Sequence, residues 1–416
     1  MWYPISMFQS DFFAGNRARL RQLFTGTAPI VITAHGLLQQ GGDEEYPFYQ
    51  DRSFFYLTGI DHPGVILVMD KGKEYLIVPF REAVMEKFDG VIDPVELARA
   101  SGIQEVLTQK EGWKRLASRL KKVQHVATLA AAPHYIDFLG MYTNPARADL
   151  IQRMKEISPH LELLDLRTHL GRMRMVKQEV ELAAIRNAIG VTTATLKEIM
   201  RPKQLAKYAY EYEIEADLSR AFRRQGHMGH AFHPIVACGE RACTMHYLRN
   251  DGPLATGELL IMDVGARADY YASDIARTVA IGGQPSRRQQ QIHAAVKEVQ
   301  QYAFSLLKPG VKIREYEKQI EAFMGEKLRE LGLIKTIDTE SVRNFFPHAT
   351  SHFLGLDTHD GGDYDRALEP GVVLAVEPGI YVPDEAIGVR IEDNLLITEG
   401  GNEILSDHLS RELTQE

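Results

Sequence analysis

The chain has 416 residues, of which 44% are hydrophobic and 25% are charged, and its net charge is -8. This length predicts two or three domains, and the composition is that of a globular protein rather than a disordered one. The negative charge, without a run of Lys or Arg, argues against a nucleic-acid partner. There is no apolar run of the ~20 residues that span a bilayer and no signal-peptide pattern, so we expect no membrane partner and a cytoplasmic location.

The first part of the chain, residues 1–174, alternates helix and strand patterns. The spacing of apolar residues predicts helices over 8–24, 94–100 and 113–122. Short apolar runs predict strands over 28–34, 54–60, 65–69, 75–79 and 125–131. Such alternation is typical of an α/β domain.

The second part, residues 175–416, combines long helices with hairpins. Helices are predicted over 177–200, 211–225, 287–307 and 314–331. Strand-like segments with hairpin patterns lie between and after them. Helices followed by hairpins, twice over, predict an α+β domain built from two similar halves. The two cysteines, Cys238 and Cys243, form neither a disulfide framework nor a structural zinc site.

Two of the predicted hairpins carry acidic residues at matching positions. In the first, Asp263 ends an apolar strand and Asp274 lies in the returning strand. A turn centred on Ala268 and Asp269 would place these two carboxylates opposite each other, with Cβ atoms ~4.5–5.5 Å apart.

The second hairpin repeats this arrangement. An apolar strand ends in Glu377, the chain turns near Asp384 and Glu385, and the returning strand contains Glu392, opposite Glu377. Four carboxylates that face one another on apolar strands repel, and burial shifts their pKa values. Two divalent ions ~3.5–4 Å apart would offset these charges and form a hydrolytic site.

His352, within the segment 347–355, is the fifth candidate ligand. Four carboxylates and one imidazole are mostly oxygen donors, which favours manganese, with cobalt, iron or zinc as alternatives.

Seven segments carry a family resemblance. They resemble the pita-bread metallopeptidases and, within these, the Xaa-Pro aminopeptidases (aminopeptidase P). Five lie around the candidate ligands, and two in the first domain resemble that family's amino-terminal signature: 261–265, 273–278, 351–360, 376–381 and 389–393, then 45–50 and 54–59. The resemblance covers essentially the whole chain.

The resemblance implies how the metal ligands are shared. Asp263 would hold one ion, His352 and Glu377 the other, and Asp274 and Glu392 would bridge both. A water or hydroxide between the ions would be the nucleophile, and Glu377 would accept its proton.

The resemblance also implies catalytic roles outside the ligands. His246 would hydrogen-bond the substrate or the tetrahedral intermediate. His359 would contact the scissile carbonyl and stabilise the oxyanion. Arg390 would orient Glu392 or Asp274.

Further positions are expected to bind substrate. His348 would line the proline subsite, and Tyr381 belongs to the same group. Arg366 would reach the leaving peptide, although its loop is shorter than the family's. Two further departures are Ala349, where the family usually has Gly, and Phe232, where it often has Tyr.

The favoured function is removal of one N-terminal residue from peptides whose second residue is proline. Proline's tertiary amide lacks an N–H and has a restricted φ, so it needs a dedicated pocket. One alternative is an Xaa-Pro dipeptidase (prolidase), and another is a non-catalytic pita-bread binding protein. The resemblance implies that the N-terminal domain closes the cleft and builds a homo-oligomer, a dimer or a tetramer.

Overall fold

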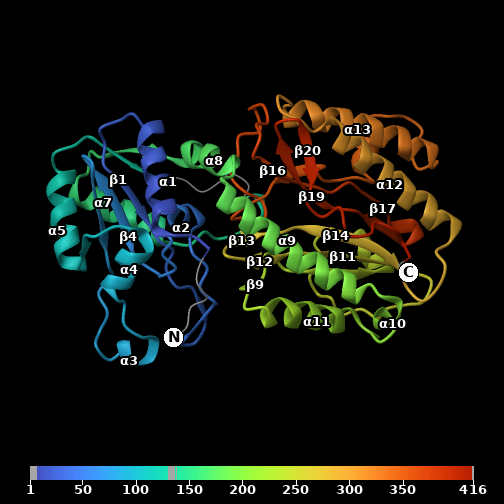
Figure 1. The fold of residues 1–416 in the computed structure, drawn as a ribbon, viewed down its shortest axis with the longest axis horizontal. Helices are drawn as coiled ribbons and strands as arrows, with labels where there is room; N and C mark the ends of the chain where they lie inside the picture. The colour runs from blue at the N-terminus through green and yellow to red at the C-terminus, as the bar shows by residue number, and fades with distance from the viewer. Residues whose placement is uncertain (1–6, 130–135, 137, 415–416) are drawn as a thin grey trace. The chain divides into compact units, whose positions relative to one another are not determined.

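The computed structural model describes residues 7–129, 136 and 138–414. These residues divide into two compact units, one of residues 8–173 and one of residues 174–414 together with Met7. The elements of each unit are labelled in Figure 1. In the described ranges, helices are all too short or too polar to cross a bilayer.

The N-terminal unit is built on a six-stranded mixed sheet, in the order β6-β5-β4-β1-β7-β8. β4 runs antiparallel to β1 and β5, and the remaining neighbours pair in parallel. Its strands are β1 (Ile30–Thr33), β4 (Ile66–Asp70), β5 (Lys73–Ile77), β6 (Val106–Leu107), β7 (His125–Thr128) and β8 (Glu162–Asp165), beside a small hairpin of β2 (Gln39–Gly41) and β3 (Glu44–Glu45).

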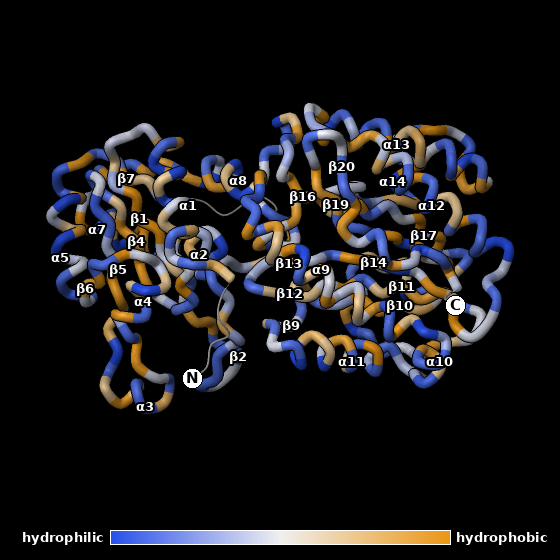
Figure 2. Tube along the Cα trace, in the orientation of Figure 1, coloured by the Kyte–Doolittle hydropathy of each residue, from blue (hydrophilic) through white to orange (hydrophobic). Residues whose placement is uncertain are grey.

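Helices pack with this sheet, and the apolar faces of α5 and α7 contribute to its core. Trp113 and Leu116 of α5 pack with Val31, Val68 and Val126 of the strands, and Figure 2 shows the central strands as its most apolar segments. The alternation of helices and strands confirms the α/β prediction. The helices are α1 (Ser10–Leu23), α2 (Arg52–Thr58), α3 (Glu86–Asp89), α4 (Pro94–Ser101), α5 (Gln109–Leu120), α7 (Ala146–Ile157) and α8 (Arg167–Met175), whose last two residues belong to the C-terminal unit.

The prediction of a strand over 54–60 is wrong, because this segment forms helix α2. The Asp51 side chain accepts a hydrogen bond from the backbone N–H of Phe54 and caps the helix. Gly59, at φ 66°, ends it in a left-handed conformation. Every residue from 53 to 58 is buried, so no polar face interrupts the apolar run and the sequence lacks a helical period.

The first half of the C-terminal unit contains two small antiparallel sheets. One has the order β10-β11-β14 and the other β13-β12-β9. The strands are β9 (Gly229–His230), β10 (Ile235–Cys238), β11 (Leu259–Val264), β12 (Ala266–Ala268), β13 (Tyr271–Ala272) and β14 (Ile275–Ala280); the helices are α9 (Glu179–Ile199), α10 (Pro202–Leu205) and α11 (Glu211–Arg224).

The second half repeats this plan. A four-stranded sheet, β15-β16-β19-β20, lies beside the β17-β18 hairpin. Figure 1 shows α9 and α11 on one side of the unit's strands and α12 and α13 on the other, as expected for two similar halves. The elements are β15 (Ser351–Phe353), β16 (Val373–Val376), β17 (Gly379–Val382), β18 (Ile387–Arg390), β19 (Asp393–Thr398), β20 (Gly401–Ile404), α12 (Arg287–Leu306), α13 (Ile313–Glu330) and α14 (Thr339–Arg343).

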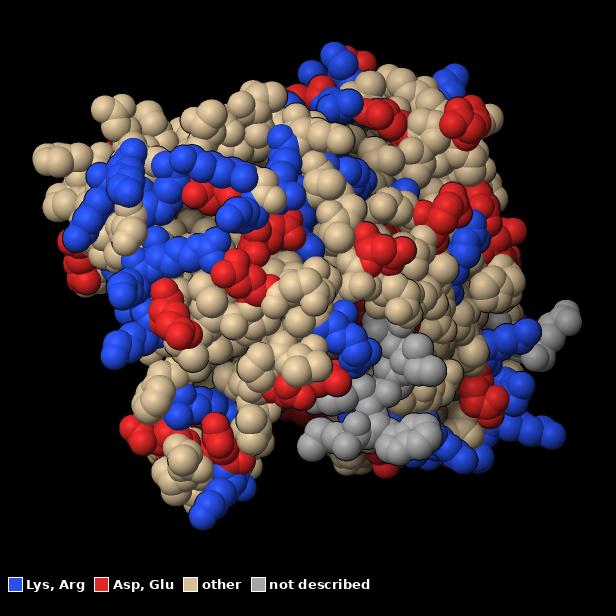
Figure 3. All heavy atoms as spheres, turned by 60° about the vertical axis from the view of Figure 1, so that its left-hand side comes forward, with Lys and Arg blue, Asp and Glu red and all other residues tan. Residues whose placement is uncertain are grey.

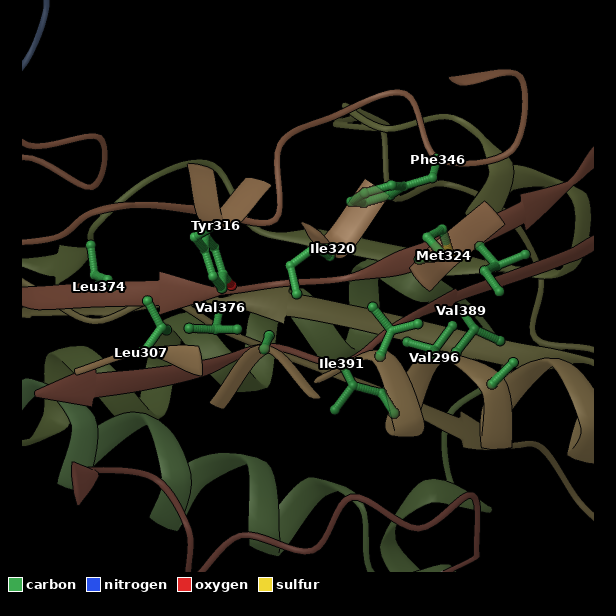
Figure 4. Close-up of a cluster of buried hydrophobic side chains, with 14 of the residues drawn as sticks. Val296, Leu307, Tyr316, Ile320, Met324, Phe346, Leu374, Val376, Val389 and Ile391 are labelled. Atoms are coloured by element: carbon green, nitrogen blue, oxygen red, sulfur yellow. The ribbon is translucent and has the colours of Figure 1, made fainter. Parts of the chain in front are cut away.

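A large apolar core lies under the strands of the second half and directs the acidic side chains away from it. Val376 and Ile391 are fully buried in this core with residues of α12 and α13 (Figure 4). Successive side chains of an extended strand point to opposite faces. Glu377 and Glu392, each next to one of these core residues, therefore project away from the apolar cluster.

The register of the second hairpin agrees with the prediction. Val376 pairs with Asp393 in one ladder, and Gly379 pairs with Arg390 in the next. The two ladders keep one register, so Glu377 lies opposite Glu392 between them.

The register predicted for the first hairpin is wrong. Asp263 pairs with Ala276 rather than with Asp274, because the turn is centred on Asp269 and Tyr270, one residue later than predicted. Both turn residues have positive φ, 47° and 72°, as in the tight turns that connect two-residue hairpins. Asp274 lies two residues from the partner of Asp263, so the two carboxylates are diagonal neighbours on one face.

Charges of both signs are distributed over the surface seen in Figure 3. Many form exposed or half-exposed pairs, such as Arg115 with Glu105 at 2.6 Å and Arg186 with Glu403 at 2.7 Å. Such pairs contribute little to stability, about 0–1 kcal/mol each.

Candidate metal centre

The two halves of the C-terminal unit meet along β14 and β18. The Thr278 hydroxyl donates to the carbonyl of Arg390 at 2.9 Å and accepts from its N–H at 3.1 Å. The N–H of Glu392 donates to the carbonyl of Ala276 at 3.0 Å. This seam brings the acidic residues of both hairpins together.

His352 of β15 lies at the centre of the cluster. Its Nε2 atom is 3.4 Å from Asp274 Oδ2, 3.5 Å from Glu377 Oε1 and 3.9 Å from Glu392 Oε1. Donor atoms of His352, Asp274 and Glu392 all lie within 4.8 Å of one another. Atoms that share one ion at bond lengths of ~2.0–2.2 Å have similar separations.

The orientation of the His352 ring is fixed by its other nitrogen. Nδ1 lies 3.1 Å from the carbonyl oxygen of Phe353 and donates a hydrogen bond to it. This contact turns Nε2 toward the carboxylates, where it donates a hydrogen bond when protonated and can bind a metal ion when neutral, the arrangement usual for histidines that bind metals.

The surroundings of these carboxylates disfavour their ionised form. Burial, with repulsion from neighbouring acids, raises the pKa of Asp274 to about 6 and that of Glu377 to about 8. It raises the pKa of Glu392 well above its usual range. Burial alone would lower the pKa of His352, but its hydrogen bond to Asp274 and the charges of Glu377 and Asp274 together outweigh burial and raise the pKa to about 9. The cluster therefore favours bound positive charge.

Three buried carboxylate oxygens of this cluster lack a hydrogen-bond partner among the described residues: Asp263 Oδ1, Asp274 Oδ1 and Glu392 Oε1. Buried polar atoms are almost always satisfied, and an exception requires a cause such as an ion. The donor set, its spacing and these three oxygens fit a divalent cation.

A chain of polar contacts leads from the acids to His348. The Arg390 guanidinium contacts Asp263 Oδ2, and its Nε donates to the Tyr381 hydroxyl at 2.8 Å. The same hydroxyl lies 2.8 Å from Nε2 of His348. Arg390 was expected to orient Glu392 or Asp274, but the acid that it contacts is Asp263. His348 and Tyr381, both predicted to bind substrate, thus lie beside the centre.

His359 lies against His352, with ring centroids 4.4 Å apart and planes at 77°. Desolvation, together with the neighbouring His352 and His246, lowers the pKa of His359 to about 4. Its imidazole is therefore neutral near pH 7. His246 is exposed, and the following residue, Tyr247, donates through its hydroxyl to Glu211 at 2.8 Å.

The other predicted positions lie at the surface or support the strands. Arg366 is exposed and pairs with Glu369 at 2.7 Å, and this contact does not place it at the centre. Ala349 is exposed. Phe232 packs beside Gly265, where a Cβ atom would lie 2.9 Å from its ring.

Three supporting residues were missed by the sequence analysis. Asn394 bonds both backbone groups of Asp274, donating to its carbonyl at 2.6 Å and accepting from its N–H at 3.1 Å. Arg277 donates to the carbonyl of Glu392 at 2.6 Å. Gln300 donates to the carbonyl of Ile391 at 2.9 Å. Asn394 and Arg277 lie next to or within the motif segments, which is the one signal that could have found them.

Comparison with known proteins identifies the family. Residues 183–399 match metallopeptidase family M24, and residues 13–128 match the aminopeptidase P N-terminal domain. The Xaa-Pro aminopeptidase of Haemophilus influenzae is 33% identical, over 96% of this chain and 95% of its own length.

The chain belongs to metallopeptidase family M24. Solved structures of Escherichia coli aminopeptidase P agree along nearly the whole chain, covering 98% of it and 97% of their own length. The low-pH form is 29% identical with a TM-score of 0.84, and the form with the inhibitor Pro-Leu is 28% identical with a TM-score of 0.82.

These similarities confirm the predicted family and fold of this M24 member. It is a metallopeptidase, and hence a hydrolase, with a C-terminal pita-bread domain preceded by an aminopeptidase P N-terminal domain. A candidate metal-binding group of Asp274, His352 and Glu392 lies in the pita-bread domain.

Proposed function

We propose that this M24 member removes the N-terminal residue of peptides whose second residue is proline. The observation that carries the proposal is the buried set of carboxylates around His352, on a chain similar from end to end to Xaa-Pro aminopeptidases. The division into an N-terminal domain (1–174) and a catalytic domain (175–416) is part of this proposal.

The proposal includes two divalent ions, most suitably Mn²⁺, with Co²⁺, Zn²⁺ or Fe²⁺ as alternatives. Asp274 and Glu392 would bridge both ions, Asp263 would hold one, and His352 and Glu377 the other. The unpartnered oxygens of Asp263, Asp274 and Glu392 support this sharing. When bound, such ions lower the pKa of water toward neutrality and polarise the scissile carbonyl.

The remaining residues would move protons and bind the substrate. Glu377, half-buried, would accept the proton of the attacking water. Neutral His359 would donate an N–H to the developing oxyanion. His246 would hydrogen-bond the substrate, and Arg390 would hold Asp263 in place through their contact.

His348 and Tyr381 would line the subsite for proline. Their hydrogen bond keeps both side chains together beside the acids, and Phe346 stacks edge-on against His348 at 4.9 Å between ring centroids. An apolar and aromatic wall suits the pyrrolidine ring. The inhibitor Pro-Leu of the similar E. coli structure is the kind of product that this pocket would release. Arg366 completes the proposed substrate-binding set.

A homo-oligomer, dimer or tetramer, and a cytoplasmic location complete the proposal. Exposed apolar side chains of the N-terminal unit, among them Phe80, Phe88 and Val91, support contacts between copies. Cys238 and Cys243 are both free thiols, which suits a reducing compartment.

The test is cleavage of matched peptides by purified protein with added Mn²⁺. Ala-Pro-Ala should lose its first residue, while Ala-Ala-Ala should remain intact. Cleavage of the dipeptide Ala-Pro with no cleavage of Ala-Pro-Ala would replace the proposal with a prolidase. If none of the three peptides is cleaved while Mn²⁺ is bound, the proposal would be replaced by a non-catalytic binding protein.

A further inference from the structure

The loop that carries His359 is fastened on both sides of that residue. Arg174 Nη2 donates to Asp357 Oδ2 at 2.6 Å and also contacts Asp360 Oδ1. Lys177 Nζ donates to Asp360 Oδ2 at 3.0 Å and to the carbonyl of Arg174 at 2.6 Å. One short segment, 174–177, therefore holds the two acids that flank His359.

These charges are deeply buried. The side chain of Lys177 is 0% exposed, that of Asp360 is 1% and that of Arg174 is 8%, whereas that of Asp357 is 42% exposed. Burying an ion pair costs about as much desolvation free energy as the attraction between the charges returns, so such a pair adds little to stability. Its role here is better explained as fixing the loop in one conformation.

The carboxylate of Asp360 has almost no room to move. A Cβ atom added at Gly355 would lie 2.2 Å from Asp360 Oδ2 and 3.0 Å from Lys177 Cε. The N–H of Asp360 donates to the carbonyl of Phe353 at 2.8 Å. The loop thus closes back onto the end of β15, the strand that carries His352.

This closure determines where the His359 ring lies. The ring meets His352 edge to face at 4.4 Å, and His359 is the residue directly before Asp360. A carboxylate that is fixed in three directions leaves its neighbour little backbone freedom. A small displacement of an oxyanion donor costs much of its effect, because the donor must meet the charge where it develops.

We propose that Arg174, Lys177 and Asp360 are positioning residues that hold the His359 imidazole in its catalytic place beside His352. This inference rests on the proposed function, in which His359 stabilises the oxyanion. The three residues act through His359, and the contacts described above join them to one another and to Asp357 rather than to the acids of the metal centre.

The test is a double-mutant cycle on the metal-loaded enzyme with Ala-Pro-Ala. Asp360→Asn should lower kcat about 10–100-fold, the range for groups that support a functional side chain, with KM and bound metal close to wild type. In the His359→Ala background the same substitution should lower kcat less than about two-fold, because residues that act as a unit are not additive.

A matched control is Glu403→Gln, which makes the same carboxylate-to-amide change in an ion pair far less buried. Glu403 pairs with Arg186 at 2.7 Å, and both side chains are nearly half exposed. This variant should keep wild-type kcat in both backgrounds.

Three results would overturn the inference. Equal loss of kcat in both backgrounds would mean that Asp360 acts on the fold in general, and loss of metal in Asp360→Asn would mean that it serves the metal centre. Full activity of His359→Ala would mean that His359 has no catalytic role, so that no residue is needed to position it. If Asp360→Asn does not fold, Gly355→Ala, which displaces the same carboxylate, replaces it in the double-mutant cycle with the same expected results. Failure of the proposed function is distinguishable, since wild-type protein would then leave Ala-Pro-Ala intact.

Discussion

At the scale of single residues, the candidate centre depends on carboxylates that conflict with one another unless a cation lies between them. Asp274→Asn and Glu392→Gln each remove one charge while keeping the side chain's shape. Each should weaken metal retention and lower kcat by more than the ~10–100-fold that supporting groups cost. Metal content after dialysis and kcat on Ala-Pro-Ala measure both effects, and wild-type values of both would refute the ligand assignment.

His359 should behave differently from the ligands. Its ring touches His352 but is not among the side chains whose donor atoms converge. His359→Ala should therefore keep its metal and lose kcat by about 10²–10³-fold, the usual cost of removing one oxyanion donor. Metal loss in this variant would show that His359 is a ligand.

At the scale of elements, the hairpin register shows what the sequence can and cannot predict. The pairing of Glu377 with Glu392 followed from the turn near Asp384 and Glu385. The first hairpin was misplaced by one turn position, because Asp269 and Tyr270 adopt positive φ and neither is Gly. The helix at 52–58 was missed because burial on all sides hides its period.

The close approach of the chain at Gly265 gives a prediction at this scale. A Cβ atom there would lie 1.8 Å from the carbonyl oxygen of Ser273, the residue before Asp274. Gly265→Ala should destabilise the protein by about 1–3 kcal/mol and weaken metal binding by displacing Asp274. Gly283→Ala, with open space around it and no positive φ, is the control. Chemical denaturation and metal titration compare the two, and equal stability would contradict the prediction.

At the scale of the whole molecule, the sequence predicted the order of long helices and the two-halved plan of the second domain, since amphipathic helices have a strong period. It predicted the types of candidate metal ligand from the acidic residues of two hairpins and from His352. It missed the supporting roles of Asn394, Arg277 and Gln300, because most of their partners are backbone groups brought near only by the fold. The ion pairs of Asp360 with Arg174 and Lys177 could not be predicted either, since these partners lie more than 180 positions away in the chain.

The pH dependence of stability should reveal the unfavourable burial of the charged groups at the metal centre. Without metal, Asp274, Glu377 and His352 have pKa values raised to about 6, 8 and 9 by the causes given above. Groups with raised pKa values stabilise the fold when protonated, so their contribution is lost as pH rises through those values. Bound metal replaces the protons. The Tm difference between Mn²⁺-saturated and EDTA-treated protein should therefore grow from about pH 5.5 to about pH 8.5. A constant or shrinking difference would contradict this.

The most direct test of the central claim is equilibrium dialysis with Mn²⁺, followed by counting the ions bound per chain. The wild type and His359→Ala should each retain two, and Asp274→Asn should retain fewer under the same free Mn²⁺. Retention of the full number by Asp274→Asn, or no retention by the wild type, would show that the acids of the two hairpins do not converge on a shared pair of cations.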